Sequence, residues 1–177
     1  MISRRSFLKA VAGGLVAAML PDLEVLADEL KTSQRNISQK GTDLIKIFEG
    51  FSPKEYLCPA GKRTIGYGHL IREEERFNII AEQEAEKILR NDVSYAASAV
   101  RRNVKVDLTQ GQYDALCSFV YNLGEGNLRK STLLKKLNSR DYNGASHEFG
   151  RWVYGNGKKL KGLENRREAE TKMFLEK

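Results

Sequence analysis

Three side chains that can do chemistry lie close together in the sequence between Phe48 and His69. Glu49 can donate a proton, the thiol of Cys58 can attack or orient a water molecule, and the hydroxyl of Thr64 can hold one. Eight residues separate the acid from the thiol, and five separate the thiol from the hydroxyl. We expect the three groups to face one another across a cleft.

Glu49 is the strongest candidate for a general acid. It closes a short helical run, so its carboxylate meets the negative end of the helix dipole, and Phe48 and Phe51 can shield it from water. Both effects favour the protonated carboxyl group that a general acid supplies near neutral pH. For a glutamate taken alone, the alternative is a solvated surface residue.

The segment from Thr64 to His69 predicts a strand with two glycines, which let another chain approach its backbone closely. An exposed Tyr67 beside an acid suits a carbohydrate cleft, because sugars bind through stacked rings and backbone hydrogen bonds. The alternative is a plain edge strand with a tight bend.

The elements that must position these groups are mostly helical. Apolar residues at helical spacing and a Thr-x-x-Gln capping box predict helices over residues 42–49, 81–101, 109–123, 131–137, 142–152 and 164–175. A small hairpin is expected over 56–68. The sequence therefore predicts a mostly helical α+β fold, with a small β-hairpin lobe and a long helix between two lobes.

The composition limits the class of protein. With 177 residues and 41% hydrophobic content, the chain suits one domain plus extra sequence. A formal net charge of +7 favours a polyanionic partner: nucleic acid, an anionic membrane or bacterial cell-wall polymer. Nucleic acid is the least favoured, because no basic block is interleaved with aromatic residues. Neither histidine has a His/Cys cluster nearby, so we expect no metal site.

Residues 1–27 predict a twin-arginine export signal rather than part of a fold. Arg4 and Arg5 precede an apolar run that ends at Leu20 and is too short to span a bilayer as a stable helix. The alternatives are a weakly hydrophobic signal anchor, which tethers the protein reversibly, and a buried N-terminal helix. The export interpretations imply transient contact with export machinery and a domain in the periplasm or cell envelope. Residues 28–40 are expected to form a linker before a domain over 41–177.

The motif from Glu49 to His69 resembles the catalytic signature of the phage-type lysozymes, the muramidase endolysins of glycoside hydrolase family 24. Further matching motifs follow in the same order, and the resemblance covers about Gly41 to Leu175. It implies a lysozyme-like fold for the catalytic domain. It also implies cleavage of the β-1,4 bond between N-acetylmuramic acid and N-acetylglucosamine of peptidoglycan, without metal or cofactor. We expect the protein to be a monomer.

Carried over by position, the resemblance implies a role for each residue of the candidate site. Glu49 would protonate the glycosidic oxygen, Cys58 takes the position of the second carboxylate, and Thr64 would help to hold the attacking water. Arg166 would pair with Glu49, which opposes the protonated form of the acid. The remaining implied roles are a structural ion pair of His69 with Asp92 and substrate contacts from Gly68, Leu70, Tyr121 and Asn122.

Cys58 is the position at which the family's chemistry does not carry over directly. Lys62 and Arg63 would favour a thiolate, which could orient water, offset positive charge on the sugar or act as a nucleophile. The alternative is a small buried hydrophobic side chain. Cys117 lies mid-stripe on a helix and is expected in the core, although a Cys58–Cys117 disulfide is conceivable in an oxidising compartment.

Two other functions stay open. A lytic transglycosylase uses one catalytic glutamate on the same bond, and the lack of a second carboxylate makes it a real alternative. In a non-catalytic wall-binding relative, Cys58 would be the substitution that abolished catalysis, but the presence of Glu49 and Thr64 argues against this function. Trp152 is expected in the core, and His147 in solvent.

Overall fold

The computed structural model describes residues 35–58 and 61–176. The chain divides into two units, Met1–Arg35 and Asn36–Lys177, and every element named below belongs to the second. The export signal expected over 1–27 and the linker up to residue 34 lie outside the described residues. In the part that is described, no helix is both long enough and apolar enough to cross a membrane.

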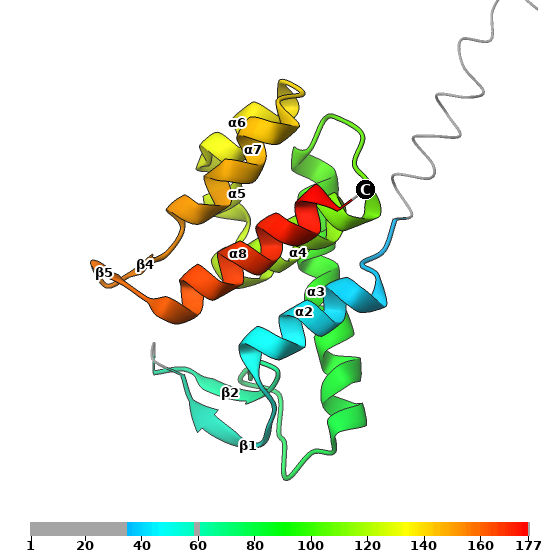
Figure 1. Ribbon diagram of the computed structural model, residues 1–177. Helices are drawn as coiled ribbons and strands as arrows, with labels where there is room; N and C mark the ends of the chain where they lie inside the picture. Colours follow the sequence, from blue (N-terminus) through cyan, green and yellow to red (C-terminus); the bar gives the residue numbers. More distant parts are fainter. Residues whose placement is uncertain (1–34, 59–60, 177) are drawn as a thin grey trace, which may run out of the picture. The chain divides into compact units, whose positions relative to one another are not determined.

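The second unit is mostly helical and carries small antiparallel sheets (Figure 1). Its helices are α2 (Gln39–Glu49), α3 (Glu82–Asn103), α4 (Gln110–Leu123), α5 (Glu125–Lys130), α6 (Thr132–Asn138), α7 (Tyr142–Glu148), the 3-10 helix η2 (Phe149–Arg151) and α8 (Lys161–Leu175). One sheet has the order β1–β2–β3, with strands Ser52–Leu57, Arg63–Gly66 and His69–Leu70. The other pairs β4 (Tyr154–Gly155) with β5 (Lys158–Lys159).

The long helix α3 joins two hydrophobic cores. Its first half packs Ala85, Leu89 and Val93 into the smaller core, beside Ile65 of β2. Its second half, residues 96–100, packs into the larger core with α4 and α8. In Figure 1, α3 runs from the level of the three-stranded sheet to that of α4. A long helix between a sheet lobe and a helical lobe was predicted, and the structure confirms it.

The helix α2 begins at Gln39, three residues before the expected start at residue 42, and so includes the last two residues of the span expected as a linker. The hydroxyl of Ser38 caps the helix by accepting a hydrogen bond from the amide of Gly41. The amide and hydroxyl of Ser38 also donate to the carboxylate of Asp114 on α4. This contact between distant segments orders residues whose polar composition alone suggests a linker.

The predicted hairpin over 56–68 is one part of a three-stranded sheet that starts at Ser52. The expected strand from Thr64 to His69 is interrupted, because Gly66 and Gly68 adopt φ angles of 64° and 88° and turn the chain into β3. The prediction of an exposed Tyr67 is wrong. The residue is 4% exposed and belongs to the smaller core, and its hydroxyl donates to Glu82 at the start of α3.

Two further elements were not predicted. Helix α5 follows Gly124 directly, where the glycines were interpreted only as a helix end. The hairpin of β4 and β5 turns at Asn156 and Gly157, which both have positive φ, and Asn-Gly is the usual signal for such a turn. The other predicted helices agree with the structure to within about three residues.

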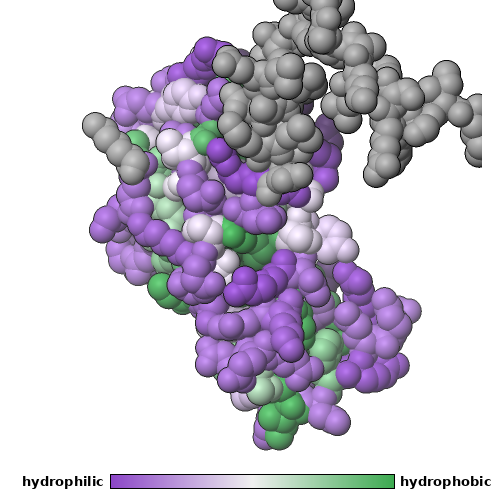
Figure 2. All heavy atoms as spheres, turned by 90° about the vertical axis from the view of Figure 1, so that its right-hand side faces the viewer, coloured by the Kyte–Doolittle hydropathy of each residue, from purple (hydrophilic) through white to green (hydrophobic). Residues whose placement is uncertain are grey.

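The surface is largely hydrophilic where Figure 2 shows it, in a view from the right of Figure 1, and apolar side chains appear there as small separate areas. Cys117 is fully buried and Trp152 packs edge-on against Phe119, so the expectation that both belong to the core is confirmed. His147 is exposed on α7, as expected.

Candidate active site

A hollow of about 500 Å³ lies where residues of α2, β3, α3 and α4 meet. It brings together seven residues of the predicted site: Glu49, Gly68, His69, Leu70, Asp92, Tyr121 and Asn122. Arg72, Tyr95 and Ala96 complete its lining. We call this hollow the cleft.

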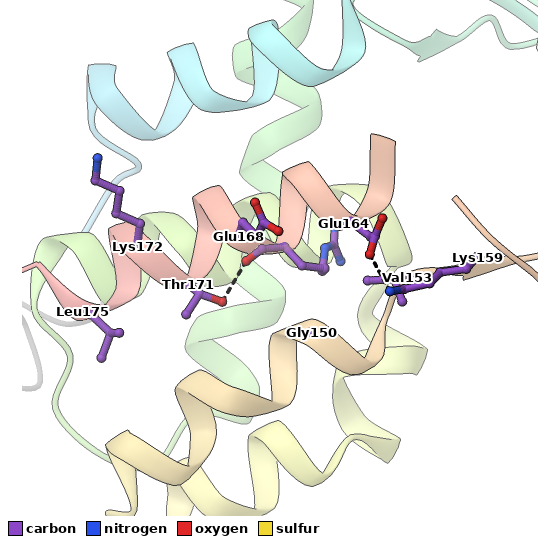
Figure 3. A pocket seen from close by; sticks show the side chains of 9 residues that line it. Gly150, Val153, Lys159, Glu164, Glu168, Thr171, Lys172 and Leu175 are labelled. Carbon is purple, nitrogen blue, oxygen red and sulfur yellow. Dashed lines mark hydrogen bonds and ion pairs between the residues drawn. The ribbon is translucent and has the colours of Figure 1, made fainter. Parts of the chain in front are cut away.

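A second hollow lies between α8 and the segment from η2 to β5 (Figure 3). Its lining residues are Gly150, Val153, Lys159, Glu164, Arg167, Glu168, Thr171, Lys172 and Leu175. An ion pair of 2.5 Å between Lys159 and Glu164 ties β5 to α8 at this hollow. Among the described residues, no member of the predicted site lines this second hollow. The cleft is therefore the candidate active site.

Glu49 is the last residue of α2, and its side chain is 22% exposed. Nη1 of Arg166, a residue that is itself 3% exposed, donates to Oε1 of Glu49 at 2.6 Å. A Cβ atom built on Gly68 would lie 3.1 Å from Oε2 of the same carboxylate. The structure thus contains the expected pairing with Arg166, and it leaves the Oε2 side of the carboxylate beside a residue that has no side chain.

Cys58 and Thr64 are not in the lining of the cleft. Cys58 is half-buried in the turn after β1, where its amide donates to the carbonyl of Lys62. Thr64 is 2% exposed, and its hydroxyl donates to the same carbonyl at 3.0 Å. Both residues therefore lie at one end of the β1–β2 pair.

Tyr56 links this turn to the acid, and sequence reasoning missed it. It pairs directly with Thr64 across the β1–β2 ladder, so the two side chains emerge on one face of the sheet. Burial raises the pKa of Tyr56, and its electrostatic interactions with Glu49 and Cys58 raise it further. Tyr56 is thus within electrostatic reach of both groups. Its position two residues before Cys58 on a strand was the available signal.

His69 lies between two carboxylates. Its Nδ1 is 2.8 Å from Oδ2 of Asp92, which is the expected ion pair, and its Nε2 is 3.0 Å from Oε2 of Glu75. Burial alone lowers the pKa of His69, but its hydrogen bonds to the two carboxylates outweigh that effect and raise the pKa. Glu75 was not predicted, because it lies in an irregular loop where spacing carries no signal.

Tyr121 and Asn122 reach the cleft from the last turn of α4. The hydroxyl of Tyr121 donates to the carbonyl of Tyr67 at 2.9 Å, which fixes its ring against the turn before β3. Oδ1 of Asn122 accepts a hydrogen bond of 2.9 Å from Nη2 of Arg167. Leu70 is 48% exposed at the rim. The expected gathering of substrate-contact candidates in one place is therefore found.

The structure does not contain the conceivable Cys58–Cys117 disulfide. Cys117 is 0% exposed in the larger core, where burial raises the pKa of its thiol. A buried, protonated thiol is inert toward disulfide exchange.

The protein-family model described as Phage lysozyme matches residues 46–170. An endolysin of Acyrthosiphon pisum secondary endosymbiont phage 1 is 47% identical in an alignment of 146 residues that covers 78% of this chain and 97% of that protein. A SAR-endolysin of Bacteriophage PS119 is 36% identical over 97% of this chain and 93% of its own length. An endolysin of Bacillus phage B103 is 46% identical over 79% of this chain, but the chain spans only 54% of that longer protein.

Solved structures show the same relationship. The muramidase domain of SpmX from Asticaccaulis excentricus superimposes with a TM-score of 0.75 at 32% identity, over 81% of this chain and 100% of that domain. These similarities confirm the predicted lysozyme-like α+β fold and the lysozyme enzyme class, and they support peptidoglycan hydrolysis as the activity. With a family model that covers most of the chain and an endolysin matched almost from end to end, the chain belongs to the phage lysozyme family.

Proposed function

We propose that this chain is an exported muramidase in which Glu49 protonates the glycosidic oxygen of the bond between N-acetylmuramic acid and N-acetylglucosamine. The observation that carries this assignment is the placement of Glu49 in the cleft, with Arg166 on one carboxylate oxygen and Gly68 beside the other.

The two oxygens of Glu49 have different surroundings, which suggests where the proton is held. A guanidinium group can only donate hydrogen bonds, so Oε1, which faces Arg166, acts as an acceptor. A proton on Glu49 therefore resides on Oε2, on the side of Gly68. From there it passes to the glycosidic oxygen as the bond to the sugar's anomeric carbon breaks. A water molecule then adds to the oxocarbenium-like centre and loses its own proton.

We assign the attacking water to Thr64 and Cys58. The hydroxyl of Thr64 donates its hydrogen bond to the carbonyl of Lys62. The lone pairs of the hydroxyl oxygen can therefore accept a hydrogen bond from water. Cys58, as a thiolate, could take up the proton or attack the anomeric carbon itself. The first route inverts the anomeric configuration and the second retains it. Proton NMR of the first product distinguishes the two routes.

The assignment of Glu49 is tested with suspensions of cell walls. We expect Glu49→Gln to lower the rate of turbidity loss by about 100- to 10,000-fold, the usual contribution of a general acid. Glu148→Gln is the matched control, because Glu148, like Glu49, is an ion-paired glutamate, but it is buried on α7, outside the lining of the cleft. A Glu49→Gln protein with wild-type activity would remove the assignment.

The same assay separates the roles of Cys58. If the thiol reacts or holds the water as a thiolate, Cys58→Ser loses activity and Cys58→Asp retains part of it. If Cys58→Ser is fully active, the thiol is dispensable.

The lack of a carboxylate at position 58 also favours an alternative reaction, that of a lytic transglycosylase. Mass spectrometry of the digest decides between the reactions, because hydrolysis adds one water to the product and transglycosylation adds none.

The proposed location is the periplasm or cell envelope, with residues 1–27 acting as an export signal or a releasable anchor. The support comes from the SAR-endolysin relatives, whose similarity extends over 97% of this chain. Replacing both Arg4 and Arg5 with lysine should reduce delivery to the periplasm if the twin-arginine route is used. Fractionation of cells, with the mass of the recovered protein, separates a cleaved signal from a retained anchor. We also propose a monomer, which gel filtration tests.

A further inference from the structure

Glu170 on α8 is fully buried, with 0% of its surface exposed, and it has no place in the mechanism above. Its Oε1 accepts hydrogen bonds from Ser118 Oγ at 2.7 Å, from Arg166 Nε at 3.2 Å and from Arg167 Nη2 at 3.3 Å. Its Oε2 lies 3.1 Å from Nε of Arg167, an ion-pair contact without hydrogen-bond geometry. A carboxylate taken out of water costs free energy unless it is paired and hydrogen-bonded, and here two guanidinium groups and a hydroxyl surround it.

Each of the two arginines that contact Glu170 also donates a hydrogen bond to a different residue of the cleft. Nη1 of Arg166 donates to Oε1 of Glu49 at 2.6 Å. Nη2 of Arg167 donates to Oδ1 of Asn122 at 2.9 Å. Glu49 comes from α2 and Asn122 from α4, and both line the cleft. One buried carboxylate on α8 is therefore connected to two cleft residues that different helices supply.

Packing holds both arginines in these orientations. The guanidinium of Arg166 lies 5.7 Å from the centre of the Phe48 ring, and that of Arg167 lies 5.2 Å from the centre of the Phe119 ring. The two arginines are 3% and 1% exposed. With solvent excluded and a ring on each guanidinium, neither side chain can move without opening the core.

The contact with Arg167 also sets which end of the Asn122 amide faces the substrate. Because a guanidinium only donates, the amide oxygen must point toward it. The amide nitrogen is left with no acceptor among residues 35–58 and 61–176. It is therefore available to donate to an oxygen of a sugar bound in the cleft.

We propose that Glu170 is a positioning residue of the active site, which holds Arg166 and Arg167 side by side and thereby sets the acid Glu49 and the amide of Asn122 relative to each other. The proposal deepens the function proposed above and rests on it. It predicts that the geometry of the cleft depends on a residue that never touches the substrate.

The charges of this network provide a readout that a purely structural role would not affect. Arg166 and Arg167 carry two positive charges, and Glu49 and Glu170 can carry two negative ones. Burial raises the pKa of Glu170, while both arginines and Ser118 oppose that rise. Burial also lowers the pKa of Arg167 to about 10, so it stays protonated at neutral pH.

Replacing Glu170 with a neutral residue leaves a surplus positive charge behind Glu49, which favours the ionised form of the acid. Glu49 shares the cleft with His69 of β3, Arg72 of the following loop, Asp92 and Tyr95 of α3 and Tyr121 of α4, and it also interacts electrostatically with Tyr56 of β1. The substitution changes none of these groups, and Tyr56 and Tyr121 stay uncharged at neutral pH, since burial raises the pKa of both. The alkaline limb of the activity profile should therefore move to lower pH in the variant, since activity ends where the acid loses its proton.

The first experiment compares Glu170→Gln with Glu148→Gln on peptidoglycan over a range of pH. Both substitutions keep side-chain shape and remove a buried carboxylate from an ion pair in the same lobe. We expect Glu170→Gln to lower kcat by about 10- to 100-fold, as a displacement of reacting groups does, and to shift the alkaline limb to lower pH. Glu148→Gln should keep both within about twofold. A Glu170→Gln protein with wild-type kcat and an unmoved alkaline limb overturns the proposal.

The second experiment remains decisive even if Glu170→Gln fails to fold. Arg167→Met and Asn122→Ala are made singly and together, and kcat/KM is measured on a soluble, uncrosslinked peptidoglycan chain. If Arg167 acts through Asn122, the kcat/KM of the double variant equals that of the less active single variant, within about twofold. If the fold-losses in kcat/KM of the two single variants multiply in the double variant, Arg167 does not act through Asn122. An inactive wild-type protein instead refutes the proposed function, so the two failures are distinguishable.

Discussion

The cluster around His69 supports a quantitative prediction about stability. The substitution Asp92→Asn removes one of the two carboxylates that face His69 and keeps the volume of the side chain. We expect the folded domain to lose stability while its turnover on peptidoglycan, at a temperature where it is folded, stays within about threefold of wild type. The reason is that the histidine joins β3 to α3, whereas Glu49 depends on Arg166.

The magnitude follows from burial. Breaking a buried ion pair by removing one partner costs about 3–5 kcal/mol. Here His69 is 8% exposed but Asp92 is 21% exposed, and Glu75 still faces the ring after the substitution. We therefore expect a loss of about 2–3 kcal/mol for Asp92→Asn, which corresponds to a fall in Tm of about 5–10 °C for a domain of this size. For Glu75→Gln, whose side chain is 27% exposed, about 1 kcal/mol is expected.

The loss should depend on pH in a direction that the pKa shifts determine. The pKa of His69 in the folded protein is raised above its usual value of about 6.5. Such a group contributes stability that is complete below the unfolded pKa and disappears as the pH rises through the folded pKa. Burial also raises the pKa of Asp92, so its contribution changes in the same direction. Asp92→Asn should therefore cost more at about pH 5.5 than at about pH 9.

Urea unfolding followed by far-UV circular dichroism, at both pH values and with reductant present, measures this difference. Asp107→Asn is the control, because Asp107 is exposed and the same substitution there should change stability by less than about 0.5 kcal/mol. An equal loss at both pH values, or a larger loss at the alkaline one, would refute the assignment of a charged His69 to this ion pair. A loss of activity far beyond threefold in folded Asp92→Asn protein would contradict its structural role.

Three further predictions concern other parts of the domain. Gly68→Ala should reduce activity by at least about tenfold in a wall-turbidity assay, because the new methyl group would lie 3.1 Å from Oε2 of Glu49 at a φ of 88°; activity equal to wild type would contradict the placement of the acid. Ser38→Ala should lower the free energy of unfolding by about 1–2 kcal/mol in urea, because it removes both the cap of α2 and a hydrogen bond to a carboxylate on α4; an unchanged midpoint would contradict this. One thiol, that of half-buried Cys58, should react quickly with a thiol reagent in the native protein, while Cys117 reacts only after unfolding; two fast thiols would show that the core around Cys117 opens.

Local chemistry in the sequence was sufficient to predict most of the helices. The capping box at Thr109 and Gln112 is present, and Gly124 ends α4 as expected. The apolar stripe of α3 correctly indicated a long helix whose buried residues form one face. These features depend on residues within one or two turns of each other, which is why a single sequence predicts them.

The errors of prediction have a different origin. Tyr67 was expected at the surface because two glycines flank it, but the start of α3 supplies Glu82 as a partner and the smaller core encloses its ring. Ser38 was placed in a linker because its neighbours are polar, yet Asp114, distant in sequence, orders it. In both cases the deciding contact comes from a segment that local pattern does not reveal.

The sequence by itself determined the class of this protein and its acid. The order and spacing of motifs around Glu49 predicted a lysozyme-like α+β domain, and the comparisons confirm that fold and family. Only the tertiary structure decided what surrounds each reactive group: Arg166 and Gly68 on the two oxygens of Glu49, a second carboxylate on His69, and Glu170 behind both arginines. The physical reason is that charge, burial and hydrogen bonding in a cleft depend on distances between segments far apart in the chain, and these distances are set when the two cores pack along α3.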